Sequence, residues 1–457
     1  MFLDLTGRND VTSTLPTSNN STFYPSASAS FVFSEAFNLG KSSNLFSYGK
    51  LRTAYGKSAN GAEPYQLDNT FNVGTFGGQS TNSLPSTIPP YNLTFQTSES
   101  IEVGTSLGFF GDKVNLDFTY YKILSENQIL QAALPASSGA SLVSFNSGKL
   151  RNEGIEVILN ANILKTKNFS WNSSLNFAKN TNYIEELAPG VKEQWLGDVF
   201  GNLGVVMKVA PGQKYGAIYG TDFLRDAQGN KQIKNVLDLS TNAVVGTEYV
   251  MTNEQVEIGN AAPKFTGGWG NTFRYNRFSV YGLLDFKVGG DIYSVDHATA
   301  AGSGLLPETL VERNGGGLPY TYPDGTKANH GVILDGYNVD DKKANDRVSH
   351  YLYKWGNQYA GWSHINRPRS LSVFENSWVK IREIAISYDL PQNIVKQSKV
   401  FQGLSLSLIA RNIGYVYSSL PDNLNPEAIN GTGNAQGLQW SAFPSFRSFG
   451  FSIRAKF

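Results

Sequence analysis

Aromatic side chains in two long segments of the sequence, 289–375 and 413–444, could bind a ligand. The residues concerned are Tyr322, Tyr351, Tyr353, Trp355, Trp362 and Trp440. Sugar rings stack on aromatic faces, and peptides bury their side chains against them. The favoured alternative is that these rings pack among the loops themselves or anchor the chain at a membrane interface.

Oxygen-bearing side chains in segment 289–375 could bind calcium. They are Asp335, Asn338, Asp340 and Asp341. Carboxylate and amide oxygens are the ligands that calcium prefers. The spacing does not follow the EF-hand pattern, so we favour a solvated acidic turn and keep calcium as the alternative.

No catalytic motif stands out, and the sequence predicts that the protein is not an enzyme. The four histidines share segment 289–375, where they occupy positions His297, His330, His350 and His364. Their spacing matches no metal-ligand template, so we interpret them as scattered surface histidines. Apart from the candidate calcium, we expect no cofactor.

Composition narrows the class of protein. The 457 residues carry a formal net charge of +1, only 16% are charged, and none is cysteine. A near-neutral chain is a poor partner for nucleic acid, which needs a basic surface. Without cysteine there are no disulfides and no thiolate sites. No apolar run approaches the roughly 18 residues of a transmembrane helix.

Alternation of apolar and polar residues predicts the elements that must position these loops. The strongest runs are 114–120, 155–163, 169–177, 278–288 and 404–411. Weaker runs are 2–8, 25–35, 46–55, 99–109 and 264–275. In 377–390 the phase slips near Arg382 and Glu383, which predicts a β-bulge. With the terminal run, 445–457, these segments predict an all-β fold of about twelve antiparallel strands.

The connections between these runs alternate in length. Counted back from Phe457, the long ones are 9–24, 56–98, 124–149, 179–262, 289–375 and 413–444. The short ones are 36–45, 110–112, 164–168, 275–277 and 391–402. Short periplasmic turns and long extracellular loops are typical of an outer-membrane β-barrel, and a sandwich or propeller has no reason to separate them. We therefore predict a segment of an antiparallel transmembrane β-barrel.

The last strand has the character of a lipid-facing strand. Phe449, Phe451 and Phe457 fall on one face, while Ser452 and Arg454 fall on the other. Its length suffices to cross a bilayer as a tilted strand. An aromatic residue at the end of such a strand is the usual ending of bacterial outer-membrane barrels, which places the chain in the outer membrane.

Several short motifs recur in a fixed order along the chain. They are FYPSASA at 23–29, KLRTAYG at 50–56, NSGK at 146–149, LRNEGIE at 150–156, WVKIR at 378–382, NPE at 425–427 and PSFRSFG at 444–450. In this order they resemble the C-terminal barrel portion of SusC/RagA-type TonB-dependent outer-membrane transporters of Bacteroidota. The resemblance covers nearly the whole chain.

The resemblance implies import of oligosaccharides or peptides across the outer membrane. It implies a SusD-type lid lipoprotein over the mouth and energy from TonB through an N-terminal plug. Barrels of this class have about 22 strands, so residues 1–457 would be roughly the second half, and the remaining N-terminal half would be its partner. We find no signal peptide, TonB box or plug in this sequence. Phe449, Phe451 and Phe457 would supply the barrel-assembly signal.

Two alternatives remain open at this stage. One is a passive porin that closes its own twelve-stranded barrel, which the missing plug favours and the resemblance opposes. The other is a soluble surface glycan-binding β protein, which would not need loops of alternating length.

Overall fold

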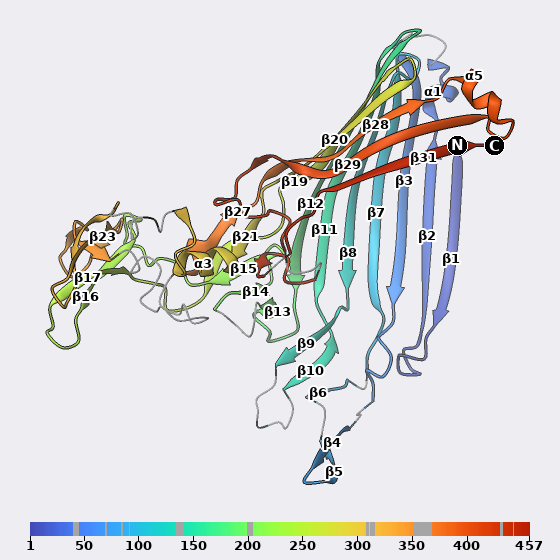
Figure 1. The fold of residues 1–457 in the computed structure, drawn as a ribbon. Coiled ribbons are helices and arrows are strands. Elements are labelled where there is room, and N and C mark those ends of the chain that lie inside the picture. The colour runs from blue at the N-terminus through green and yellow to red at the C-terminus, as the bar shows by residue number, and fades with distance from the viewer. Residues whose placement is uncertain are drawn as a thin grey trace.

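The computed structural model is built on one twelve-stranded antiparallel sheet (Figure 1). The structure describes residues 1–39, 45–68, 71–83, 86–90, 92–133, 137, 141–198, 204–307, 310, 316–350, 368–429, 433–441 and 443–457. The strands of the large sheet are β1 (Phe2–Val11), β2 (Ser21–Phe31), β3 (Phe46–Asn60), β7 (Gln96–Phe109), β8 (Val114–Glu126), β11 (Lys149–Lys165), β12 (Phe169–Glu186), β19 (Phe265–Tyr275), β20 (Phe278–Val288), β28 (Trp378–Asp389), β29 (Gly403–Ser418) and β31 (Ser448–Lys456). Every strand that alternation predicts is present, so the predicted all-β fold is confirmed.

The strands follow one another in the sheet as they do along the chain. Their register places like residues together: Leu159 pairs with Leu175, and Asn160 pairs with Ser174. Because side chains alternate along a strand, one face of the sheet is apolar and the other is rich in hydroxyls and amides. β1 and β31 lie at the two edges of this order, and none of the pairings of these two described strands joins them.

The predicted β-bulge is confirmed. Leu283 pairs with Glu383 and Leu284 pairs with Ile381, so Arg382 has no partner in this register. The ladder between β28 and β29 also shifts between Ile381 and Glu383. The extra residue explains why the apolar positions of β28 change phase.

Long side chains on the polar face cross neighbouring strands over glycines. Arg52 of β3 passes over Gly104 of β7, where a Cβ would lie 2.7 Å from the guanidinium carbon. It then pairs with Asp117 of β8 at 2.7 Å. Tyr121 of β8 passes over Gly154 of β11 and donates a hydrogen bond to Asn180 of β12 at 3.1 Å. These glycines therefore make room for links between strands that are not direct neighbours.

Long and short connections lie at opposite ends of the strands, with one exception (Figure 1). Among its described residues, the turn end carries the short helical segments α1 (Phe33–Ala36), α5 (Gln392–Val395) and η5 (Lys396–Ser398). The predicted length was wrong for the first connection of the loop end. This connection spans only 12–20, because β1 and β2 extend further than predicted. It is shorter than the connection 32–45 at the turn end.

The connections at the loop end form small sheets of their own, which the sequence did not predict. Their strands are β4 (Asn72–Phe76), β5 (Gln79–Ser83), β6 (Thr87–Ile88), β9 (Ile129–Ala133), β10 (Leu142–Asn146), β13 (Gln194–Asp198), β14 (Val206–Val209), β15 (Ala217–Gly220), β16 (Gln232–Leu237), β17 (Val244–Tyr249), β18 (Val256–Asn260), β21 (Asp291–Ser294), β22 (Leu318–Thr321), β23 (Lys327–Ile333), β24 (Tyr337–Asn338), β25 (Lys343–Ala344), β26 (Val348–His350), β27 (Val373–Glu375) and β30 (Leu438–Gln439). In the described part of these connections lie the helical segments α3 (Val295–Gly302) and η4 (Arg369–Ser372). No helix in the described part of the chain is long and apolar enough to span a membrane.

Candidate binding site at the loop end of the sheet

A small apolar core joins three long connections at the loop end. Its buried residues are Val205, Met207, Ile218, Tyr293, Val295 and Leu438. They come from the segments around β14 and β15, around β21, and from β30, which pairs in parallel with β21. We call this group the loop core; it fixes connections that are distant in sequence against one another.

The predicted ligand-binding aromatics do not form one group among the described residues. Trp440 packs against the loop core. Tyr322 directly follows β22 of a different sheet, where its hydroxyl hydrogen-bonds His330 Nδ1 at 2.7 Å and its ring contacts Tyr320. Tyr351, Tyr353, Trp355 and Trp362 lie outside the described residues. For Trp440 and Tyr322 the structure thus places the rings in packing contacts between loop residues.

His350 lies beside Tyr322 and His330. Its ring is 6.1 Å from that of His330 and 5.5 Å from that of Tyr322. Burial, with a smaller contribution from His330, lowers the pKa of His350 to about 4. His350 is therefore neutral at physiological pH and acts in this cluster as an aromatic ring.

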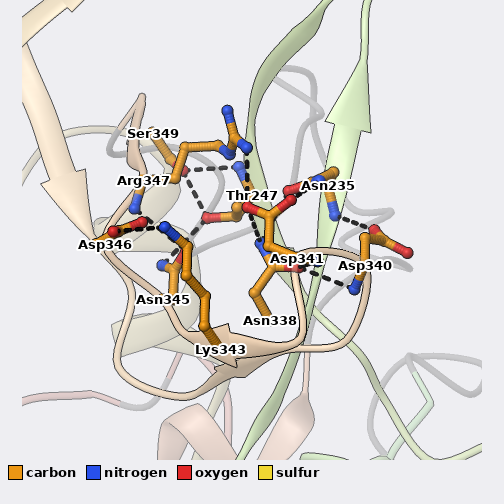
Figure 2. Close-up of polar contacts among 10 residues, drawn as sticks. All are labelled: Asn235, Thr247, Asn338, Asp340, Asp341, Lys343, Asn345, Asp346, Arg347 and Ser349. Atoms are coloured by element: carbon orange, nitrogen blue, oxygen red, sulfur yellow. Dashed lines mark hydrogen bonds and ion pairs between the residues drawn. The ribbon is translucent and has the colours of Figure 1, made fainter.

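The predicted acidic cluster is a hydrogen-bonded turn (Figure 2). Asn338 is fully buried, and its side-chain oxygen accepts hydrogen bonds from the N–H groups of Asp340 and Asp341 at 3.0 and 3.1 Å. Asp341 accepts from Asn235 at 2.9 Å and pairs with Arg347 at 2.8 Å. These two partners, Asn235 first, lower the pKa of the Asp341 carboxyl.

Asp335 stands apart from that turn and has its own partners. It forms an ion pair with Lys231 at 2.8 Å and accepts a hydrogen bond from Tyr249. Burial alone would raise the pKa of Asp335, but these two contacts outweigh it and the pKa is lowered. Among the described residues no group of three acidic or histidine side chains could hold a metal ion. Asn338, Asp340 and Asp341 therefore share one turn and Asp335 does not, and the carboxylates already have protein partners.

Removal of calcium is expected to leave the loop sheets unchanged. Because Arg347 and Lys231 already neutralise Asp341 and Asp335, EDTA should not alter the melting temperature of the full-length protein, measured by calorimetry with and without added calcium. A rise of several degrees on adding calcium would contradict this expectation and support the calcium alternative.

A charged cluster anchors the last long connection to the polar face of the sheet. The Glu427 carboxylate binds Lys380 and Arg382 of β28, the latter at 2.6 Å, and Arg382 also binds Asp285 of β20 at 2.7 Å. The Lys380 side chain is only 2% exposed. The two cations outweigh the effect of burial and lower the pKa of Glu427.

The neighbours of Glu427 are held in the same way. Asn425 accepts a hydrogen bond from Tyr415 at 2.9 Å, and the Pro426 carbonyl accepts one from Asn376 at 2.9 Å. All three residues of the NPE motif therefore contact the sheet or the segment leading into β28. The sequence singled out this motif only as part of a resemblance and assigned it no structural role.

Two cavities open between the end of β12 and the loop connections. The mouth cavity, of about 330 Å³, is lined by Ala178, Asn180, Asn182, Met207, Tyr215, Gly216, Ala261, Ala262, Pro263, Phe265, Thr266, Gly433, Asn434 and Gln436. The side cavity, of about 220 Å³, lies next to it and includes Lys149 and Glu186. Tyr215 and Asn434 line both, and the Tyr215 hydroxyl donates a hydrogen bond to the Asn434 side chain.

Sequence reasoning missed these cavity residues. Tyr215 and Asn434 are 219 residues apart, and only the folding of two long connections brings them together. Asn180 and Asn182 fell in the predicted connection 179–262, whereas the structure places them in the last part of β12. The one available signal was the unusual number of asparagines on the polar face of 169–186.

Comparison with known proteins agrees with this fold. Residues 2–304 match the family described as TonB dependent receptor-like, beta-barrel. The chain is similar to two proteins of Formosa agariphila: TonB-dependent receptor P3, 24% identical over 99% of this chain, and TonB-dependent receptor P26, 28% identical over 100% of it. It spans 43% and 44% of their lengths, which is less than half of each relative.

Among solved structures the chain is similar to the RagAB peptide importer. The closed-closed state aligns with a TM-score of 0.71 and 19% identity, over 99% of this chain and 45% of that one. The open-open state aligns with a TM-score of 0.70 and 18% identity, over 100% and 45%. At this identity the likeness shows a shared fold.

Proposed function

This chain belongs to the TonB-dependent receptor β-barrel family, and on that premise we propose that the protein containing it imports a nutrient across the outer membrane with energy from TonB. The family places the chain in the outer membrane, so the soluble glycan-binding alternative is wrong. The relatives are named TonB-dependent receptors, which supports a role in transport rather than catalysis.

The observation that carries this proposal is the twelve-stranded antiparallel sheet with folded connections gathered at one end. A barrel wall of this kind surrounds a lumen, and loops positioned by a rigid scaffold are where binding residues concentrate. The loop core and the Glu427 cluster hold these connections in fixed places. They can therefore shape a binding site above the lumen.

The substrate is an oligosaccharide or a peptide, and a SusD-type lipoprotein covers the mouth. Support for these finer points comes from the sequence motifs and, for peptides, from the similarity in fold to the RagAB peptide importer. The edges β1 and β31 pair with the remaining strands of the barrel, since unpaired backbone groups in lipid are costly. In a self-contained porin these two edges would instead pair with each other.

Growth and uptake measurements test the proposal. A deletion strain complemented with the full-length gene should take up the nutrient only while TonB is active. The deletion strain should fail to grow on that nutrient, offered within a panel of oligosaccharides and peptides. Uptake that persists without TonB would favour the passive porin, and unchanged growth on every nutrient of the panel would contradict import.

Phe457, which directly follows β31, should matter for assembly. Phe457 is 73% exposed on the apolar face, and its ring lies 5.2 Å from that of Phe401. We expect Phe457→Ala to reduce the amount of full-length protein in isolated outer membranes several-fold, measured by immunoblot. Phe443→Ala, at an exposed position of the last connection, is the matched control and should leave the amount unchanged. Equal amounts for both variants would contradict this role.

A further inference from the structure

The mouth cavity has an uncharged polar wall. Asn180 and Asn182 of β12 line it together with Asn434 and Gln436 of the last connection, and Thr266 of β19 completes the polar part. None of the described residues that line this cavity is Asp, Glu, Lys, Arg or His. The cavity therefore offers hydrogen bonds without offering a counter-charge.

The same cavity has an apolar part. The Tyr215 ring lies in it with Met207, Pro263 and Phe265. Tyr215 is half-buried, and burial raises the pKa of its hydroxyl, which stays protonated and donates to Asn434. A ligand in the cavity thus meets an aromatic ring and a set of carboxamides.

These groups match a sugar chain better than a peptide. A primary amide offers an acceptor and two donors side by side, which suits neighbouring hydroxyls of a sugar. The apolar face of a sugar ring suits an aromatic side chain. A free peptide carries a terminal ammonium and carboxylate. Transferring such a charge from water to a site without a partner for it is unfavourable.

We propose that the mouth cavity is a binding subsite for a neutral oligosaccharide, held by Asn182, Asn434 and the Tyr215 ring. This inference rests on the proposed import function and narrows its substrate to one class. The Tyr215–Asn434 hydrogen bond positions the Asn434 carboxamide between the mouth cavity and the side cavity. A longer chain can extend into the side cavity, where Lys149 is already paired with Glu126 at 3.0 Å.

Calorimetric titration of the full-length protein in detergent tests this assignment. The probes are neutral maltooligosaccharides and xylooligosaccharides, acidic galacturonate oligomers, and short peptides with free or capped termini. Asn182→Asp and Asn434→Asp keep the side-chain shape but add a charge, and each should weaken binding of the neutral sugar about tenfold, the loss of roughly one hydrogen bond. Tyr215→Ala should weaken it by a similar factor, and Tyr215→Phe by less.

The matched control is Asn162→Asp. Asn162 lies on the same polar face but lines a separate cavity nearer the turn end, so this variant should bind the neutral sugar like the wild type. If this control lost as much affinity for the neutral sugar, any added charge in the barrel would explain the loss. That result would overturn the assignment. Heat-modifiable migration on gels shows whether each variant folds.

Other outcomes separate this inference from the proposed function. Binding of capped peptides with the same sensitivity to Asn182→Asp would make the cavity a peptide site and overturn it. Binding of none of the neutral sugars by the wild type would also overturn it. If TonB-dependent uptake is present but insensitive to all of these substitutions, the import proposal stands and the subsite is wrong.

Discussion

Replacing Glu427 with alanine is expected to destabilise the protein by about 3–5 kcal/mol, the usual effect of removing one partner from a buried ion pair. The variant leaves the Lys380 ammonium, on a side chain only 2% exposed, without its carboxylate. It also removes the 2.6 Å contact between Glu427 and Arg382. Denaturant unfolding of the full-length protein in detergent measures the change, and limited proteolysis should detect release of the last connection.

Glu383 of β28, which directly follows Arg382, provides the control. It pairs with Arg411 at 2.7 Å, but the Arg411 side chain is 59% exposed. Exposed ion pairs contribute about 1 kcal/mol or less, so Glu383→Ala should have a small effect. Adding Lys380→Met to Glu427→Ala should recover part of the lost stability, because the buried charge is then gone. Equal effects of Glu427→Ala and Glu383→Ala would contradict the anchoring role.

The same contact predicts a dependence on pH. The pKa of Glu427 in the folded protein lies below its ordinary value of 4.5. A carboxyl whose pKa is lowered by folding contributes stability above its unfolded pKa, and this contribution disappears as the pH falls through the folded value. The difference in stability between wild type and Glu427→Gln should therefore be constant near neutral pH and shrink below about pH 4.5.

Local alternation was enough to predict the sheet. Each strand could be predicted because one of its faces contacts lipid and the other contacts water. The alternation of apolar and polar residues therefore depends only on the strand itself. The bulge at Arg382 was readable for the same reason, since an extra residue changes the phase of the apolar positions. The exact ends were less predictable: β12 continues through Tyr183 to Glu186, into a region that read as loop.

The binding residues were not predictable in this way. β30 pairs with β21 although Leu438 and Tyr293 are far apart in the sequence, and two-residue strands such as β30 have no pattern to read. Trp440 packs against the loop core, and its residue type alone did not separate this favoured packing contact from ligand binding. The partners of the acidic turn were not predictable either: Asp341 binds Arg347 six residues away and also Asn235, which is distant in the sequence.

Replacing Gly154 with alanine is expected to destabilise the barrel by about 1–3 kcal/mol, the range for forcing extra atoms into a packed site. A Cβ there would lie 2.4 Å from the Lys179 carbonyl oxygen and 2.5 Å from the Tyr121 hydroxyl. The tyrosine can move, but the carbonyl belongs to the backbone of β12. The paired strands β11 and β12 must therefore separate locally, which the heat-modifiable midpoint of the full-length protein should report.

Gly282→Ala is the matched control, because a Cβ at Gly282 of β20 would meet no atom within 4 Å. Removing a glycine from a strand at an open position should be neutral or stabilise by up to about 1 kcal/mol. Tyr121→Ser in the Gly154→Ala background should relieve the contact with the tyrosine but not the one with the carbonyl. If the double variant recovers wild-type stability, the contact with Tyr121 is the reason that position 154 needs a glycine. If it does not, Gly154 is required by the close approach of β12, and its place in the LRNEGIE motif reflects strand pairing.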